Sequence, residues 1–150
     1  MGGTPWKARA KWQSDISEVL NAARESVFRD GEYTTIPGRE FASLAELDAF
    51  FMGEPDVDDD GWVDDSGFSG TSSILDIRGV SEHSEPGVTA PLNTRDTEAL
   101  FGTRTPSANE LTDARTSKIY ERLERGDSLY VVLHDAGAPV EVVFFGYSWD

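Results

Sequence analysis

The sequence predicts a single α+β domain over residues 1–150, in which two or three helices pack on a mostly antiparallel sheet with a C-terminal β-hairpin. Three observations lead to this fold class. Apolar and basic residues alternate near the N-terminus, two helical patterns have recognisable ends, and two apolar, β-branched runs flank a turn near the C-terminus. A chain of 150 residues suits one domain, and it contains no internal repeat and no linker long enough to divide it.

The first predicted element is a strand between Trp6 and Trp12, because its residues alternate strictly in polarity. Successive side chains of a strand point to opposite faces. We therefore expect an apolar face and a basic face on this strand. The apolar face would consist of Trp6, Ala8, Ala10 and Trp12, and the basic face of Lys7, Arg9 and Lys11.

Two helices are predicted next. Ser14 is the expected N-cap of the first, which stops at Asp30-Gly31. Its apolar residues recur at helical spacing and are Ile16, Val19, Leu20, Ala23 and Val27. Ser43 and Glu46 form a capping-box pattern that opens a second, short helix. That helix closes at Gly53, and its expected inward residues are Leu44, Leu47, Phe50 and Phe51.

The second half of the chain predicts a strand, two more helices and the hairpin. We expect a strand over Ser72–Ile77, an irregular Gly/Pro/Ser-rich connection over Gly79–Thr89 and a short helix over Thr94–Phe101. Pro106-Ser107 and Glu110 predict the start of a long helix that reaches about Arg125. On a helical wheel, four basic residues of that helix share one stripe: Arg115, Lys118, Arg122 and Arg125.

The predicted hairpin joins two continuous apolar runs, Leu129–His134 and Val140–Phe145, through a loop of several residues over Asp135–Pro139. Continuous apolarity indicates strands that are covered on both faces. His134 ends one of these runs, at a place where active-site residues often lie. A role for Asp135 in setting the turn is the simpler interpretation of the His134-Asp135 pair, because neighbours on a strand point to opposite faces.

The charge balance constrains the partner. The chain has 28 acidic and 13 basic residues and a net charge of −15, so it should repel nucleic-acid backbones and anionic membranes. A basic protein or a cation fits this charge, as does solubility alone. The absence of cysteine excludes disulfides and thiolate sites. The N-terminus lacks the apolar run of a signal peptide, and no segment has 18 consecutive apolar residues. We therefore expect a cytoplasmic protein.

The negative charge is concentrated in one acidic stretch. Six carboxylates fall within ten residues, at Asp56, Asp58, Asp59, Asp60, Asp64 and Asp65. Asp56, Asp58, Asp60 and Asp64 are spaced like the front of an EF-hand loop, so calcium is a possible cofactor. However, Gly67 stands where that loop needs a bidentate Glu, and Gly53-Glu54-Pro55 breaks the chain where the loop needs a helix. A partner-facing or a solvated acidic loop is the alternative interpretation.

Several segments together resemble a family of small acidic bacterial proteins. They are Ala23–Tyr33, Gly70–Asp76, Leu133–Glu141 and Phe145–Ser148. No activity is assigned to that family, so the resemblance implies a shared fold and a bacterial, cytoplasmic origin, and it implies no mechanism. In size and charge the chain is also similar to immunity proteins that neutralise basic toxins.

The sequence favours a non-enzymatic interaction protein that binds a basic protein partner, and an immunity or inhibitor role is the concrete version of this hypothesis. The expected binding residues are the six aspartates together with Trp62 as a desolvated anchor. One alternative is a small enzyme with a pocket that contains His134. Another is a calcium-responsive module that uses the 56–65 loop.

Overall fold

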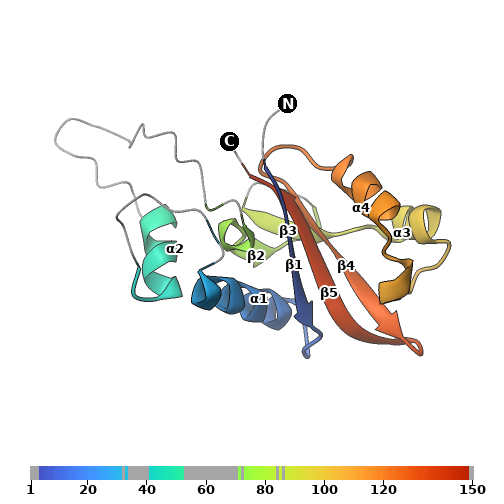
Figure 1. Ribbon diagram of the computed structural model, residues 1–150, viewed down its shortest axis with the longest axis horizontal. Coiled ribbons are helices and arrows are strands. Elements are labelled where there is room, and N and C mark those ends of the chain that lie inside the picture. The colour runs from blue at the N-terminus through green and yellow to red at the C-terminus, as the bar shows by residue number, and fades with distance from the viewer. Residues whose placement is uncertain are drawn as a thin grey trace.

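The computed structural model describes residues 4–31, 33, 41–52, 71, 73–83, 85 and 87–148. Within these residues, a five-stranded sheet separates helices α1 and α2 on one side from α3 and α4 on the other (Figure 1). The α+β class is confirmed, with more helices in the described part than the two or three expected. No helix among the described residues has the length and apolarity needed to cross a membrane.

The strand order is β1-β5-β4-β3-β2. Strands β1 (Pro5–Lys11), β5 (Ala138–Tyr147) and β4 (Ser128–Asp135) pair antiparallel, whereas β3 (Val88–Pro91) and β2 (Gly79–Val80) add in parallel beside β4. The sheet is therefore mixed, and the expectation of a mostly antiparallel sheet was wrong in its outer part. Strands of two and four residues are too short to show a hydrophobic period, and they lie within the segment that we expected to be irregular or at its end.

The hairpin is confirmed, but its turn is tighter than predicted. Ala136 and Gly137 alone connect β4 to β5, and both have positive φ angles, 51° and 81°. Two residues with φ above zero define the type I′ turn, whose twist matches that of the flanking strands. Asp135 pairs with Ala138 as the last rung of the ladder. The predicted loop of several residues was thus too long.

The helix boundaries show which polar residues act as caps. Helix α1 (Ile16–Asp30) begins where Asp15, rather than Ser14, accepts a 2.9 Å hydrogen bond from the Glu18 backbone N–H. It ends at Gly31, as predicted. Helix α2 (Leu44–Met52) has the expected Ser43 cap, whose hydroxyl accepts from the Glu46 N–H at 3.1 Å. Its Leu47 is buried, while the side chains of Phe50 and Phe51 lie outside the described ones.

Two predicted elements take another form. The expected strand over Ser72–Ile77 is a 3-10 turn, η1 (Ile74–Asp76), because the Ser73 hydroxyl caps it by accepting from the Leu75 N–H at 3.1 Å. Helix α3 (Thr94–Phe101) has the predicted bounds. The long helix expected from Ser107 to Arg125 is instead η2 (Ala108–Glu110) followed by α4 (Asp113–Tyr120).

The long helix is interrupted because Leu111 leaves the helical region, at φ −82° and ψ 78°, and Thr112 then caps a new start. Arg122 and Arg125 consequently lie beyond α4, so the expected four-residue basic stripe does not form. Arg115 also points inward, where it donates to the carbonyl oxygens of Leu100 at 3.0 Å and Glu110 at 2.8 Å. Arg115 therefore joins α3 to α4.

Strand β5 supplies both hydrophobic cores, as its continuous apolarity predicted. Val142 and Phe144 are fully buried on the α1 side, and Val143 and Phe145 are fully buried on the α3/α4 side. The first core is completed by Trp6, Val19, Leu20, Ala23, Ile74 and Ile77, and the second by Phe101, Ile119, Leu123, Leu129, Val131 and Leu133. The β1 face with Trp6, Ala8, Ala10 and Trp12 is the inward one.

Gly146 is required by the packing of Trp6, its partner across the β1–β5 ladder. Trp6 is only 7% exposed. A Cβ atom on residue 146 would lie 2.1 Å from Cζ2 and 2.3 Å from Cε2 of the indole ring. The indole therefore occupies the space that any other residue at position 146 would need.

We predict that Gly146→Ala lowers the free energy of unfolding by about 1–3 kcal/mol, the range expected for overpacking a core. Gly79→Ala is the matched control, because a Cβ there meets only the Val88 side chain at an ordinary 3.8 Å. Urea denaturation of both variants checks this. Equal losses would show that the indole does not constrain position 146.

We predict that Ala136→Asn raises the free energy of unfolding by roughly 0.5–1 kcal/mol, because Asn tolerates the left-handed conformation better than Ala. Ala138→Asn is the control, since residue 138 is exposed on β5 and has no positive φ. The measurement is thermal unfolding followed by circular dichroism. A loss at position 136 would argue against the type I′ turn.

Candidate functional site

The predicted partner-binding residues lie outside the described residues. This applies to Asp56, Asp58, Asp59, Asp60, Asp64, Asp65 and Trp62, and hence also to the four candidate calcium ligands. In the described ranges, no three Asp, Glu or His side chains come together in a way that could hold a metal ion. The structure instead describes the segments on either side of the acidic stretch. Helix α2 precedes the stretch and Thr71 follows it.

The first end is held by an ion pair between α1 and α2. Arg24 is 5% exposed, and its guanidinium forms a two-pronged contact with the Asp48 carboxylate, including Nη1 to Oδ2 at 3.0 Å. Arg24 also donates to the Leu75 carbonyl oxygen at 3.1 Å. A bidentate arginine–carboxylate pair fixes orientation as well as distance. Arg24 therefore attaches α2 to α1 and, through its bond to Leu75, α1 to η1.

A second arginine lies near the same carboxylate. Arg78 Nε is 3.9 Å from Asp48 Oδ1. Burial lowers the pKa of Arg78 from its ordinary value, and the negative charge of Asp48 opposes that shift. Asp76 also acts electrostatically on Arg78, so Arg24 and Arg78 are balanced by the two carboxylates Asp48 and Asp76.

The other end is held by hydroxyl groups around Asp76. The backbone N–H and the hydroxyl of Thr71 donate to Asp76 Oδ1 at 2.6 and 2.8 Å. The Thr71 hydroxyl is also 2.7 Å from the Ser73 hydroxyl, which in turn caps η1. Thr71 is fully buried. The chain is thus attached to the α1 side of the sheet immediately after the acidic stretch.

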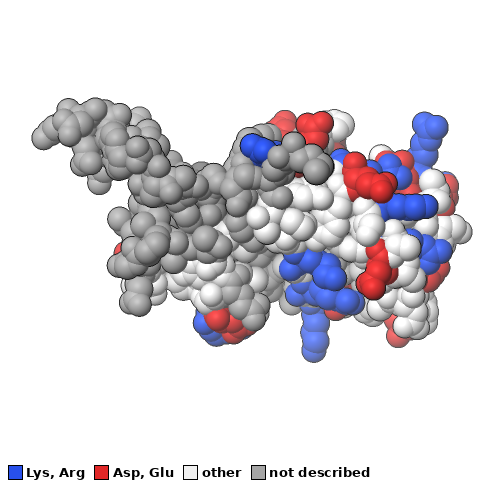
Figure 2. All heavy atoms as spheres, turned by 45° about the horizontal axis from the view of Figure 1, so that its top comes forward, with Lys and Arg blue, Asp and Glu red and all other residues white. Residues whose placement is uncertain are grey.

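On the face that Figure 2 shows, charges of both signs are intermingled over the described residues. Eighteen of the 28 acidic and twelve of the 13 basic residues lie in the described part, which leaves six of the fifteen net negative charges there. Five of the described basic side chains lie within ion-pair distance of described carboxylates: Arg9, Arg24, Arg78, Arg104 and Arg122. Most of the net charge therefore lies elsewhere in the chain.

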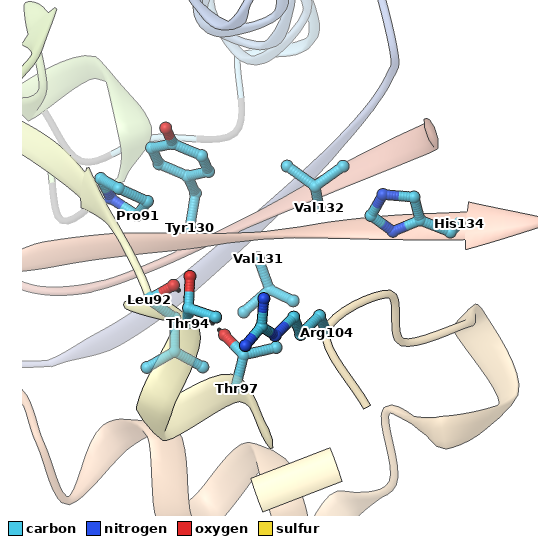
Figure 3. Close-up of a pocket in the computed structure, with 9 residues that line it drawn as sticks. All are labelled: Pro91, Leu92, Thr94, Thr97, Arg104, Tyr130, Val131, Val132 and His134. Atoms are coloured by element: carbon cyan, nitrogen blue, oxygen red, sulfur yellow. Dashed lines mark hydrogen bonds between the residues drawn. The ribbon is translucent and has the colours of Figure 1, made fainter. Parts of the chain in front are cut away.

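His134 lines a pocket of about 150 Å³ at the β4 edge (Figure 3). The pocket is bounded by the end of β3 at Pro91, by Thr94 and Thr97 of α3, and by Arg104. The side chains of Tyr130, Val132 and His134 lie on one side of β4 and Val131 on the other. Burial raises the pKa of Tyr130 above its ordinary value, so this phenol stays neutral.

His134 has one polar atom that the fold does not use. Its backbone N–H donates to the Pro106 carbonyl oxygen at 2.8 Å, next to an irregularity in the β4–β5 register. Its Nδ1 is buried and has no hydrogen-bond partner among the described residues. The neighbouring Asp135 is exposed at the turn and is not among the pocket residues. The two residues therefore do not form a catalytic pair.

The buried pairing of Arg24 and the position of Arg104 at the pocket were not predicted from the sequence. Arg24 had a detectable signal, because it follows Ala23 on the apolar face of the helical pattern, where an arginine needs a partner. Arg104 had no such signal, since it lies in an irregular segment after α3. Comparisons of the chain with protein-family models, curated proteins and solved structures found no match.

We predict that Asp48→Asn destabilises the protein by about 2–3 kcal/mol, because it leaves the buried Arg24 without an opposing charge. Glu141→Gln is the control. It removes the Arg9–Glu141 pair, whose side chains are 44% and 30% exposed, and should cost under about 1 kcal/mol. The two variants are compared by guanidinium denaturation. Similar small losses would mean that Arg24–Asp48 does not hold α2 in place.

Proposed function

We propose that this protein is a non-enzymatic interaction protein that binds a basic protein partner through its acidic stretch, in the manner of an immunity or inhibitor protein. The observation that carries the proposal is the uneven distribution of charge. Residues 53–70 contain seven carboxylates and no basic residue, whereas the described part is close to balanced. Like charges this close repel one another, and a cationic partner surface relieves that repulsion.

The anchored ends of the stretch support this proposal. The Arg24–Asp48 pair on one side and the Thr71–Asp76 contacts on the other attach the chain immediately outside residues 53–70. A segment attached at both ends has fewer conformations to lose on binding than a free tail of the same length. The acidic residues would thus be accessible to a partner on a defined side of the protein.

The binding mode follows from the chemistry of the residues. Concentrated negative charge steers a basic partner and raises the association rate more than the final affinity. Asp56, Asp58, Asp59, Asp60, Asp64 and Asp65 would supply this attraction. Trp62, in the middle of them, would supply the apolar contact area that charge alone lacks.

Binding is favoured over catalysis by the properties of the described pocket. Its volume of about 150 Å³ holds no more than a ring-sized molecule and is below the roughly 300–1,000 Å³ that is common for sites of larger ligands. The second candidate function remains a small enzyme that uses His134, and the unpaired Nδ1 of that residue is the observation in its favour. The test is a His134→Gln variant. If this variant keeps full partner binding and loses no reaction that the wild-type protein catalyses, the result argues against the enzyme candidate.

We predict that replacing the six aspartates by asparagine slows association with the partner about tenfold or more and flattens its salt dependence. The partner is first captured from native cell lysate at low salt and identified. Stopped-flow fluorescence of the natural tryptophans then gives association rates over a range of ionic strength.

The control removes the same number of charges from the described surface. It neutralises the exposed residues Glu25, Glu82, Glu85, Glu121, Glu124 and Asp135. This variant should retain most of the salt slope. An identical slope for both variants, or an unchanged slope for the first, would contradict the proposal. Calcium titration of the wild-type protein tests the calcium-responsive alternative separately, by whether heat is released.

A further inference from the structure

The pocket beside His134 opens onto a gap in the hydrogen bonding of the β4 edge. Alternate residues of a strand direct their backbone N–H and C=O groups to the same edge. The Tyr130 carbonyl accepts from the Leu92 N–H at 3.0 Å on this edge, and the His134 N–H donates to the Pro106 carbonyl at 2.8 Å. Val132 lies between them, so both its backbone groups face the same edge.

The gap exists because the neighbouring chain turns away at this point. Strand β3 ends at Pro91, and its ladder with β4 stops at the Pro91–Tyr130 pair. The Leu92 carbonyl, which would be the next acceptor, instead accepts from the Thr97 hydroxyl at 3.2 Å. Within the described part of the chain, no hydrogen bond is made by the backbone N–H or C=O of Val132 on this edge. The Val132 N–H donor and the Val132 C=O acceptor thus lie next to each other on this edge without a partner among the described residues.

The side chains around the gap add a few polar groups to mostly apolar walls. Pro91, Leu92 and Val131 provide apolar surface. Arg104 extends toward Thr94 and Thr97 in the close-up (Figure 3), and its Nε is paired with Glu98. Its terminal guanidinium nitrogens have no hydrogen-bond partner among the described residues. The volume of about 150 Å³ is enough for a benzene-sized ring.

We propose that this pocket binds a small planar molecule with an unsubstituted carboxamide group. The carboxamide oxygen accepts from the Val132 N–H, and the carboxamide NH₂ donates to the Val132 carbonyl. The flat body of the ligand lies between the apolar wall of Val131 and the guanidinium of Arg104, which can stack on a ring face. The ligand thereby completes the sheet edge where β3 leaves it. This site is independent of the acidic stretch.

A carboxylate is disfavoured at the same place, although Arg104 would attract it. A carboxylate has acceptors only, so one of its oxygens would face the Val132 carbonyl oxygen, and both groups would remain unsatisfied. Val132 is half-buried, and a polar group that is left unpaired costs up to about 1–3 kcal/mol where water cannot reach it. The backbone pair therefore selects for an amide and against an acid of the same shape.

The test uses benzamide, benzoate and acetophenone as probes on the full chain, followed by ¹H–¹⁵N correlation spectra. The three differ only in the group that faces Val132: an amide, an acid and a methyl ketone. We expect benzamide to shift the Val132 amide signal in a saturable way at millimolar concentration, with at least about tenfold weaker binding of the other two. Benzoate binding as tight as benzamide would show an anion contact with Arg104 only and would overturn the proposal.

A filled pocket provides the second arm of the test. Thr94→Phe places a ring in the pocket. Thr94 is an exposed residue in the first turn of α3, and its side chain lines the pocket. Ser117→Phe adds the same ring on the exposed face of α4, away from the pocket. Benzamide binding should be lost in the first variant and kept in the second. No shift of Val132 in the wild type, or equal binding by both variants, would refute the site.

Discussion

The structure depends on one constraint, the burial of β5 on both faces while it pairs with a strand on each side. Val142 and Phe144 complete one core, and Val143 and Phe145 complete the other. Because side chains alternate across a strand, a slip of one residue would exchange the two sets and place each in the wrong core. The hairpin turn at Ala136-Gly137 and the close fit of Trp6 on Gly146 keep this register.

The contacts that flank the acidic stretch and the pocket both lie at the margins of this sheet. On the α1 side, Arg24 and Asp48 attach α2, and Thr71 attaches the chain where it returns after the acidic stretch. On the α3 side, the departure of β3 after Pro91 leaves Val132 with an unused donor and acceptor. The pocket arises because β3 leaves the sheet after Pro91.

How much could be predicted from the sequence depended on the length of each pattern. The alternation in Trp6–Trp12, the stop at Gly31, the bounds of α3 and the two-sided burial of the hairpin were all readable from periodicity and caps. The Ser107/Glu110 capping box was also recognised, but it caps only η2, because nothing local indicated that Leu111 would leave the helix. The short strands β2 and β3 are held by pairing with distant residues, which no local pattern encodes. For the same reason the Val132 gap was not predictable, whereas the charge of the acidic stretch was.

The central claim is that a basic partner binds to residues 53–70 and not to the sheet edge or its pocket. Hydrogen exchange followed by mass spectrometry, on the protein alone and in complex with the captured partner, tests this claim most directly. The account predicts slowed exchange in peptides that cover residues 53–70, with β4 and α3 unchanged. Slowed exchange around Val132 and His134, with residues 53–70 unaffected, would contradict it.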